Sequence, residues 1–148
     1  NVRNNMVSPA GPVYHAGTLS GNPLAMAAGY TLLSELNEHP EYYDELEEKG
    51  QYLKEGLRKV LDSKGIDYTI NQVGSMMTLF FTAGPVVDQA SAQQTDTDLF
   101  GRFYHGMLER GIYLPPSNFE CFFLSRTLTN EMLDQTIVAA DKALDDIV

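Results

Sequence analysis

The sequence predicts an α+β fold in which helices pack on one side of a small antiparallel sheet. Two observations carry this prediction. Apolar side chains recur at helical spacing in four segments, and between these segments lie short runs with the alternating or densely apolar pattern of strands. A chain of 148 residues, 43% hydrophobic and 20% charged, is also long enough to bury one core.

The first predicted helix covers residues 23–38. Ser20 or Asn22 can cap its first N–H groups, and the proline that follows suits the first helical position, where its missing N–H is not needed. A His-Pro pair at residues 39–40 then interrupts the pattern. A second helix follows and ends at Gly65, as expected of a glycine C-cap.

The rest of the chain switches between strand and helix patterns. Residues 76–82 form a dense apolar run typical of a central strand, whereas residues 86–97 are polar, lack periodicity and predict a surface loop. Asp96 or Thr97 caps the next helix, and Thr129 caps the last one. Strands are predicted at residues 67–73, 76–82, 112–114 and 119–124. The loop is predicted at 86–97, and the two helices at 97–110 and 130–147.

Charge and composition disfavour several classes of partner. A net charge of −10 argues against nucleic acid and anionic membrane surfaces, which bind basic patches. No apolar run approaches the roughly 18 residues of a membrane span, and no signal peptide pattern opens the chain. The single cysteine, Cys121, cannot form an internal disulfide and suits a small core position, so we expect a cytoplasmic protein.

Familiar catalytic and metal-binding arrangements are missing from the sequence. His15, His39 and His105 are far apart and have no partner at metal-ligand spacing, so no metal site is expected. No serine lies in a Gly-x-Ser-x-Gly elbow. The lysines all lie on predicted helices among acidic residues, so none is a candidate to form a Schiff base.

A stretch of small residues, 16–29, runs from a loop straight into the first predicted helix. Its glycines give the backbone access to unusual dihedral angles. The first turn of such a helix offers N–H groups and the positive end of a dipole to an anion. Thr18 adds a hydroxyl beside Gly17. The stretch is therefore a candidate phosphate site, and the alternative is a helix start that binds nothing.

Glu120 is the one carboxylate in an otherwise apolar segment, directly after a Pro-Pro-Ser-Asn turn. Two explanations are open. In the first, an edge strand turns its polar face to water. In the second, the turn at residues 117–120 points Glu120 into a pocket with polar partners.

Four stretches together resemble the glutamate-1-semialdehyde aminomutases, a family of pyridoxal phosphate-dependent class III aminotransferases. The first reads Ala-Gly-Thr-Leu-Ser-Gly-Asn-Pro-Leu-Ala-Met-Ala-Ala-Gly, and the last reads Pro-Pro-Ser-Asn-Phe-Glu. Related class III enzymes share the Gly-Asn-Pro helix start. The longer form Gly-Thr-Leu-Ser-Gly-Asn-Pro, combined with Pro-Ser-x-Phe-Glu, is typical of a much smaller group of enzymes. The matching stretches are, in order, residues 16–29, 74–82, 103–114 and 115–120.

The resemblance implies the C-terminal domain of a fold-type I pyridoxal phosphate-dependent transferase. The family reaction moves the amino group of glutamate 1-semialdehyde from C2 to C1, giving 5-aminolevulinate for tetrapyrrole synthesis. The cofactor is pyridoxal 5'-phosphate or pyridoxamine 5'-phosphate, and the enzyme is a homodimer acting on a small molecule. The resemblance further implies that Gly17 and Thr18 hold the cofactor phosphate of the neighbouring subunit, and that Glu120 lies near the substrate.

The resemblance also implies that this chain is a piece of a longer enzyme. The family lysine that forms the Schiff base lies upstream of the glycine stretch, so no catalytic residue is assigned here. We therefore expect the 148-residue chain to be inactive alone and not to bind the cofactor. Residues 1–22 are expected to be a leading loop from a large domain. Residues 23–148 are expected to form a helix pair and the small α+β domain.

One position departs from the family pattern, and two other functions stay open. Leu128 stands where the family usually has a histidine. The nearest alternative function is that of another class III aminotransferase, acting between an amino donor and a keto acid. The alternative from a different class is a non-catalytic interaction domain, in which the glycine stretch merely starts a helix.

Overall fold

The computed structural model describes residues 11–12 and 17–147 of the chain. The chain divides into two compact units, Asn1–Pro40 and Glu41–Val148. The boundary expected at residue 22 rests on the resemblance to longer enzymes, and it stays a prediction.

The first unit contains α1 (Pro23–Glu38), whose bounds coincide with the predicted helix. Asn22 is its N-cap: the side-chain Oδ1 accepts hydrogen bonds from the backbone N–H groups of Leu24 (3.0 Å) and Ala25 (3.1 Å). None of the side chains of α1 is buried, and Tyr30 is 77% exposed.

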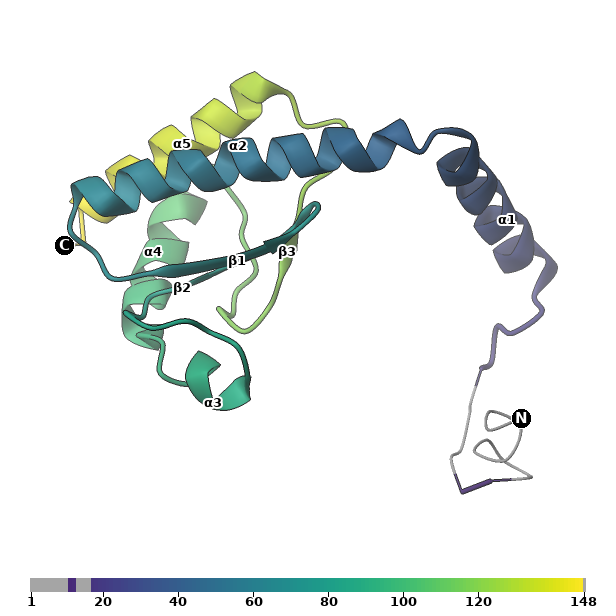
Figure 1. Cartoon of the computed structure of the whole chain (residues 1–148), viewed down its shortest axis with the longest axis horizontal. Coiled ribbons are helices and arrows are strands. Elements are labelled where there is room, and N and C mark those ends of the chain that lie inside the picture. The colour runs from purple at the N-terminus through teal and green to yellow at the C-terminus, as the bar shows by residue number, and fades with distance from the viewer. Residues whose placement is uncertain (1–10, 13–16, 148) are drawn as a thin grey trace. The chain divides into compact units, whose positions relative to one another are not determined.

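The second unit is the predicted α+β domain. Its helix α2 ends two residues before Gly65, whose φ of +65° is easily adopted by glycine alone, so the predicted helix end is confirmed. In Figure 1, α2 and α5 lie side by side on one side of the sheet, and α3 lies on the other. The elements are α2 (Glu41–Ser63), β1 (Thr69–Val73), β2 (Met76–Phe80), α3 (Gln89–Ala92), α4 (Thr97–Glu109), β3 (Phe122–Phe123) and α5 (Asn130–Asp145).

The three strands form an antiparallel sheet in the order β1-β2-β3, so β2 is central as predicted. The β1–β2 hairpin pairs Val73 with Met76 next to its tight turn. On the other side of β2, Met77 pairs with Phe122. A further backbone bond, from the N–H of Leu124 to the carbonyl of Ser75 (2.9 Å), extends this pairing past β3.

The core lies between one face of the sheet and the three long helices, as the fold class predicts. Met77 and Leu79 of β2 are 1% and 5% exposed, and they belong to one cluster with the buried residues of α2, α4 and α5. Burial of a side chain of this size contributes roughly 1.5–3 kcal/mol. The helical members of the cluster are Leu53, Leu57, Val60, Leu61, Phe100, Phe103, Met107, Leu133, Ala139, Ala140, Ala143 and Leu144.

Two predicted strands are wrong or too long. Residues 112–114 do not form a strand, because the N–H of Ile112 is used by the carbonyl of Met107 (3.0 Å) in the C-terminal turn of α4. The strand predicted at 119–124 shrinks to two residues. There, the N–H of Glu120 bonds to the carbonyl of Ser117 (3.1 Å) in a tight turn, so strand pairing begins only after it.

The predicted surface loop at residues 86–97 contains a one-turn helix, α3. Asp88 caps it, accepting a hydrogen bond from the N–H of Ser91 (2.8 Å), while the Ser91 hydroxyl accepts one from the N–H of Asp88 (3.0 Å). This reciprocal capping box stabilises a helical turn in a segment that has no apolar periodicity, which is why the apolar pattern did not predict the helix.

Gly50 marks a close approach between α2 and the β1–β2 turn. A Cβ at this position would lie 2.5 Å from the carbonyl oxygen of Gly74 and 2.4 Å from the Gln72 side chain. The carboxylate of Glu47, which lies one helical turn before Gly50, accepts a hydrogen bond from the N–H of Gly74 (2.8 Å). This bond fixes the β1–β2 turn against α2. The missing side chain therefore lets α2 lie against the hairpin.

We expect Gly50→Ala to lower the free energy of unfolding by about 1–3 kcal/mol, because a backbone carbonyl cannot move aside as a flexible side chain can. Gly101→Ala is the matched control: it also lies in a helix of the second unit, and its Cβ would contact nothing within 4 Å. It is expected to raise stability by up to about 1 kcal/mol. Urea unfolding measures both, and equal effects of the two substitutions would contradict the close approach.

The capping box also predicts a pH dependence for α3. Hydrogen bonds from the backbone N–H and then the hydroxyl of Ser91 lower the pKa of Asp88 below its ordinary value of 3.8. A group whose pKa is lower in the folded state stabilises that state above its unfolded pKa, and this is lost as the pH falls through the folded pKa. We expect hydrogen exchange of the Ser91 amide to accelerate, beyond its intrinsic pH dependence, below about pH 4. Asp88→Asn should abolish that acceleration, and an unchanged profile in this variant would contradict the assignment.

Candidate functional site

Gly17 and Thr18 lie in an exposed turn that leads to α1. The N–H of Ser20 bonds to the carbonyl of Gly17 (2.9 Å), and the N–H of Asn22 bonds to that of Leu19 (3.0 Å). A Cβ on Gly17 would lie 2.0 Å from the Ser20 hydroxyl oxygen, so no side chain fits there without rearrangement. The turn therefore presents backbone and hydroxyl groups to its surroundings.

The donors for an anion belong to this turn rather than to the helix that follows. The expectation of free N–H groups in the first turn of α1 is wrong for its first three residues. Pro23 has no N–H, and those of Leu24 and Ala25 bond to Asn22. In the described part of the chain, the Thr18 hydroxyl and the backbone N–H of Thr18 have no partner. They are among the groups that this turn offers to a phosphate.

Glu120 lies in a turn and not in a strand, so the explanation by an edge strand is wrong, and the turn at residues 117–120 that the second explanation requires is present. The turn closes through the bond from the Glu120 N–H to Ser117, and the Ser117 hydroxyl oxygen also accepts the N–H of Phe119 (3.2 Å). Glu120 is exposed and directly precedes the segment that pairs with β2. Its carboxylate is accessible to a small molecule.

The turn rests on the core through its other side chains. Asn118 is only 4% exposed, and its Nδ2 has no hydrogen-bond partner among the described residues. Below it lies a cavity of about 30 Å³. Most of the cavity lining is apolar: Leu53, Leu57, Leu79, Phe100, Phe103, Met107, Leu114, Pro115 and Phe122, with Thr78, Ser117, Asn118, Glu120 and Thr136. A pocket with polar partners for Glu120 stays a prediction.

The predicted phosphate residues and Glu120 fall in different units of the chain. Gly17 and Thr18 precede Pro40, whereas Glu120 belongs to the unit that begins at Glu41.

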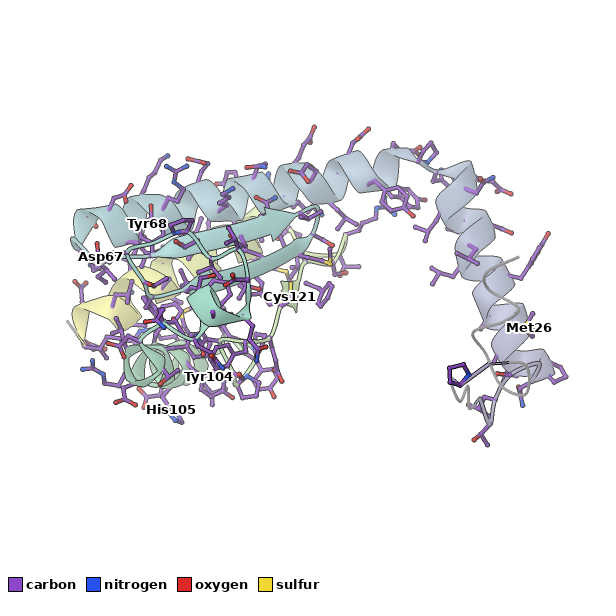
Figure 2. All side chains as sticks on the ribbon, turned by 60° about the horizontal axis from the view of Figure 1, so that its bottom comes forward. Met26, Asp67, Tyr68, Tyr104, His105 and Cys121 are labelled. Carbon is purple, nitrogen blue, oxygen red and sulfur yellow. The ribbon has the colours of Figure 1, made fainter. Side chains whose placement is uncertain are left out.

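The remaining chemistry-bearing side chains form no second centre in the described residues. No group of three or more His, Cys, Asp or Glu side chains there is arranged to hold a metal ion. Figure 2 shows His105 beside Tyr104 on α4, well away from Cys121. Cys121 is half-buried, and its thiol donates to the carbonyl of Met77 (3.4 Å). His15 lies outside the described residues.

Two further findings concern membrane-spanning helices and position 128, which departs from the family pattern. Among residues 11–12 and 17–147, no helix is long and apolar enough to cross a membrane. Leu128, where the family pattern has a histidine, is half-buried and packs against the hydrophobic core.

Sequence patterns gave no sign of a polar cluster around Arg126. Its guanidinium carbon lies 3.3 Å from the centre of the Tyr42 ring, and its Nε donates to Glu45 (2.8 Å). The Arg126 carbonyl accepts a hydrogen bond from Lys49. The hydrogen bond to Glu45 raises the pKa of Arg126 above its ordinary value. The cluster joins the start of α2 to the segment after β3.

The sequence profile described as aminotransferase class-III matches residues 2–144. This chain belongs to the class III aminotransferases. Curated relatives include the glutamate-1-semialdehyde 2,1-aminomutase of Thermus thermophilus, 58% identical over 138 residues, and that of Flavobacterium psychrophilum, 52% identical over 138 residues. Each alignment covers 93% of this chain and 32% of the relative, so the chain spans about a third of their length.

Solved structures agree on the fold. The β-phenylalanine aminotransferase of Variovorax paradoxus matches with a TM-score of 0.77 at 29% identity, over 92% of this chain and 31% of that one. A glutamate-1-semialdehyde aminomutase from Pseudomonas aeruginosa matches with a TM-score of 0.79 at 19% identity, over 95% and 31%. The resemblance in fold and family is confirmed.

The residues present fit the phosphate of the family cofactor, pyridoxal phosphate. The turn at Gly17 and Thr18 is exposed and offers a backbone N–H and a hydroxyl, the donor types that bind phosphate oxygens. Gly17 itself contributes no side chain to that turn. A phosphate can therefore approach the backbone there.

Proposed function

We propose that this chain is the C-terminal part of an aminomutase that converts glutamate 1-semialdehyde to 5-aminolevulinate in tetrapyrrole biosynthesis. The observation that carries the proposal is the 58% identity to the Thermus thermophilus enzyme of that name over 93% of the chain. The two exposed turns, at Thr18 and at Glu120, are the groups this chain contributes to the reaction.

The cofactor, when bound, supplies the amino group and the electron sink that an amino-group migration requires. The Thr18 hydroxyl and its backbone N–H donate to the cofactor phosphate of the neighbouring subunit in a homodimer. Both are neutral donors, which suits a chain whose net charge of −10 provides no general attraction for an anion. Their task is to hold and orient the cofactor.

Glu120 acts on the substrate side. Its exposed carboxylate suits a protonated amino group, and the turn that closes on Ser117 fixes its backbone. The buried Asn118 anchors the same turn to the core, so the carboxylate projects from a rigid support. We assign Glu120 to binding and orienting the substrate.

The longer enzyme is the protein in which the activity resides. Residues 1–22 lead out of its large domain, and the chain alone lacks the Schiff-base lysine, so we propose that it neither reacts nor binds the cofactor in isolation. A cytoplasmic homodimer is the assembly we propose. Aminolevulinate formation by the isolated chain above the blank rate would contradict this.

A chimaeric enzyme tests the function, with this chain replacing the matching third of the Thermus thermophilus relative. We expect it to convert glutamate 1-semialdehyde to 5-aminolevulinate without any added amino acceptor. A class III aminotransferase acting between an amino donor and a keto acid needs that acceptor. Strict dependence on a keto acid would therefore favour the alternative function.

Thr18→Val in the chimaeric enzyme tests the phosphate role. Loss of one hydrogen bond to a charged phosphate costs about 1.5–3 kcal/mol, so we expect cofactor affinity to fall about 10- to 100-fold. Thr31→Val is the control, because Thr31 is an exposed α1 residue whose hydroxyl bonds only to the Ala27 carbonyl (2.9 Å). Pyridoxamine phosphate titration followed by absorbance measures both affinities. A Thr18→Val affinity equal to that of the control would rule the role out.

Glu120→Gln in the same enzyme tests the substrate role. We expect turnover to fall about 10-fold or more, because a charge-assisted hydrogen bond becomes a neutral one, while cofactor affinity is kept. Glu109→Gln removes the same charge from an exposed position at the end of α4 and should leave turnover unchanged. Steady-state kinetics with glutamate 1-semialdehyde decide the matter, and unchanged turnover in Glu120→Gln refutes the assignment.

A further inference from the structure

The first two turns of α2 contain no fully buried residue, and Glu47, which accepts the N–H of Gly74 (2.8 Å), ties only their end to the β1–β2 turn. The buried residues of α2 begin only at Gly50, nine residues into the helix. The residue before the helix is Pro40, whose side chain has no oxygen with which to cap the first N–H groups. A helix start with neither burial nor a side-chain cap frays unless other contacts hold it.

Contacts to residue 126 hold this segment on one face. Tyr42, Glu45 and Lys49 lie three and four residues apart and therefore share one side of the helix. The Tyr42 ring stacks on the Arg126 guanidinium (3.3 Å), Glu45 accepts its Nε (2.8 Å), and Lys49 donates to the Arg126 carbonyl. Side chain and backbone of one residue thus tie two turns of helix to the loop between β3 and α5.

The cluster lies close in the chain to the turn that carries Glu120. Arg126 follows Glu120 by six residues, across the short β3 strand that is paired with β2. The cluster therefore joins the start of α2 to the segment that follows Glu120.

We propose that Arg126 is a positioning residue: it holds the first two turns of α2 against the loop after β3, and so supports the segment that follows the Glu120 turn. The kinetic part of this proposal rests on the proposed function. A planar guanidinium is needed, because stacking on Tyr42 and the directed bond to Glu45 are made at the same time.

Hydrogen exchange on the 148-residue chain tests the clamp without any activity. We expect Arg126→Ala to accelerate exchange of the amides of residues 45–49 about three- to tenfold, as expected for loss of an exposed cation–π contact and a surface ion pair. Exchange in α4 and α5 should stay unchanged. Arg58→Ala is the matched control, because its ion pair with Glu55 (3.3 Å) lies within α2. Unchanged exchange at residues 45–49, or equal acceleration in the control, overturns the clamp.

Two milder variants keep the test valid if Arg126→Ala fails to fold. Arg126→Lys retains the charge but not the planar stacking group, so we expect intermediate acceleration. Tyr42→Leu removes the ring that the guanidinium covers and should accelerate the same amides. Wild-type exchange in both variants contradicts the proposal.

Kinetics of the chimaeric enzyme test the positioning role. We expect Arg126→Ala to lower kcat about three- to tenfold while KM changes less than twofold, with partial recovery in Arg126→Lys. A raised KM at unchanged kcat, or no change in either, overturns the positioning role. Failure of the proposed function is distinct from both results, because then the unmodified chimaeric enzyme itself forms no 5-aminolevulinate.

Discussion

The packing of β2 against three helices is the interaction on which the second unit depends. Met77 and Leu79 point into the cluster formed by α2, α4 and α5, and the same strand pairs with β1 on one edge and β3 on the other. The turn that carries Glu120 has few internal contacts of its own. It is held because Phe122 pairs with β2 and because Asn118 is buried. A substitution that disrupts the packing of this core would therefore also disturb the turn that carries Glu120.

Local chemistry explains how much of this fold could be predicted. Caps at Asn22, Asp96 and Thr129 gave the starts of three helices, since each side chain bonds an N–H group two or three residues away. The strand predicted at 112–114 does not form, and the one predicted at 119–124 is reduced to two residues, because nearby turns use the backbone N–H groups. Apolar pattern alone cannot report such competition. The helix α3 was missed for a different reason: its segment has a capping box but no apolar periodicity.

Less of the candidate site than of the fold could be predicted from the sequence. Gly17, Thr18 and Glu120 were predicted as site residues because they lie in short motifs that resemble a family. Membership of that class is confirmed by the match over residues 2–144, while the roles of the three residues stay predictions. Arg126 belongs to no such motif. Its partner Glu45 lies 81 residues earlier, and only the fold brings the two together. Contacts of this kind carry no signal in a single sequence.

We propose that one subunit supplies Thr18 to the active site in which its partner supplies Glu120. Mixed dimers of the chimaeric enzyme measure this directly, formed by refolding equal amounts of Thr18→Val and Glu120→Gln chains. If the phosphate contact crosses the interface, each mixed dimer has one site without either substitution, and about a quarter of all sites regain full activity. If both residues serve the same subunit, every site carries a substitution. The account predicts that recovery, and activity no higher than the mean of the two separate variants would contradict it.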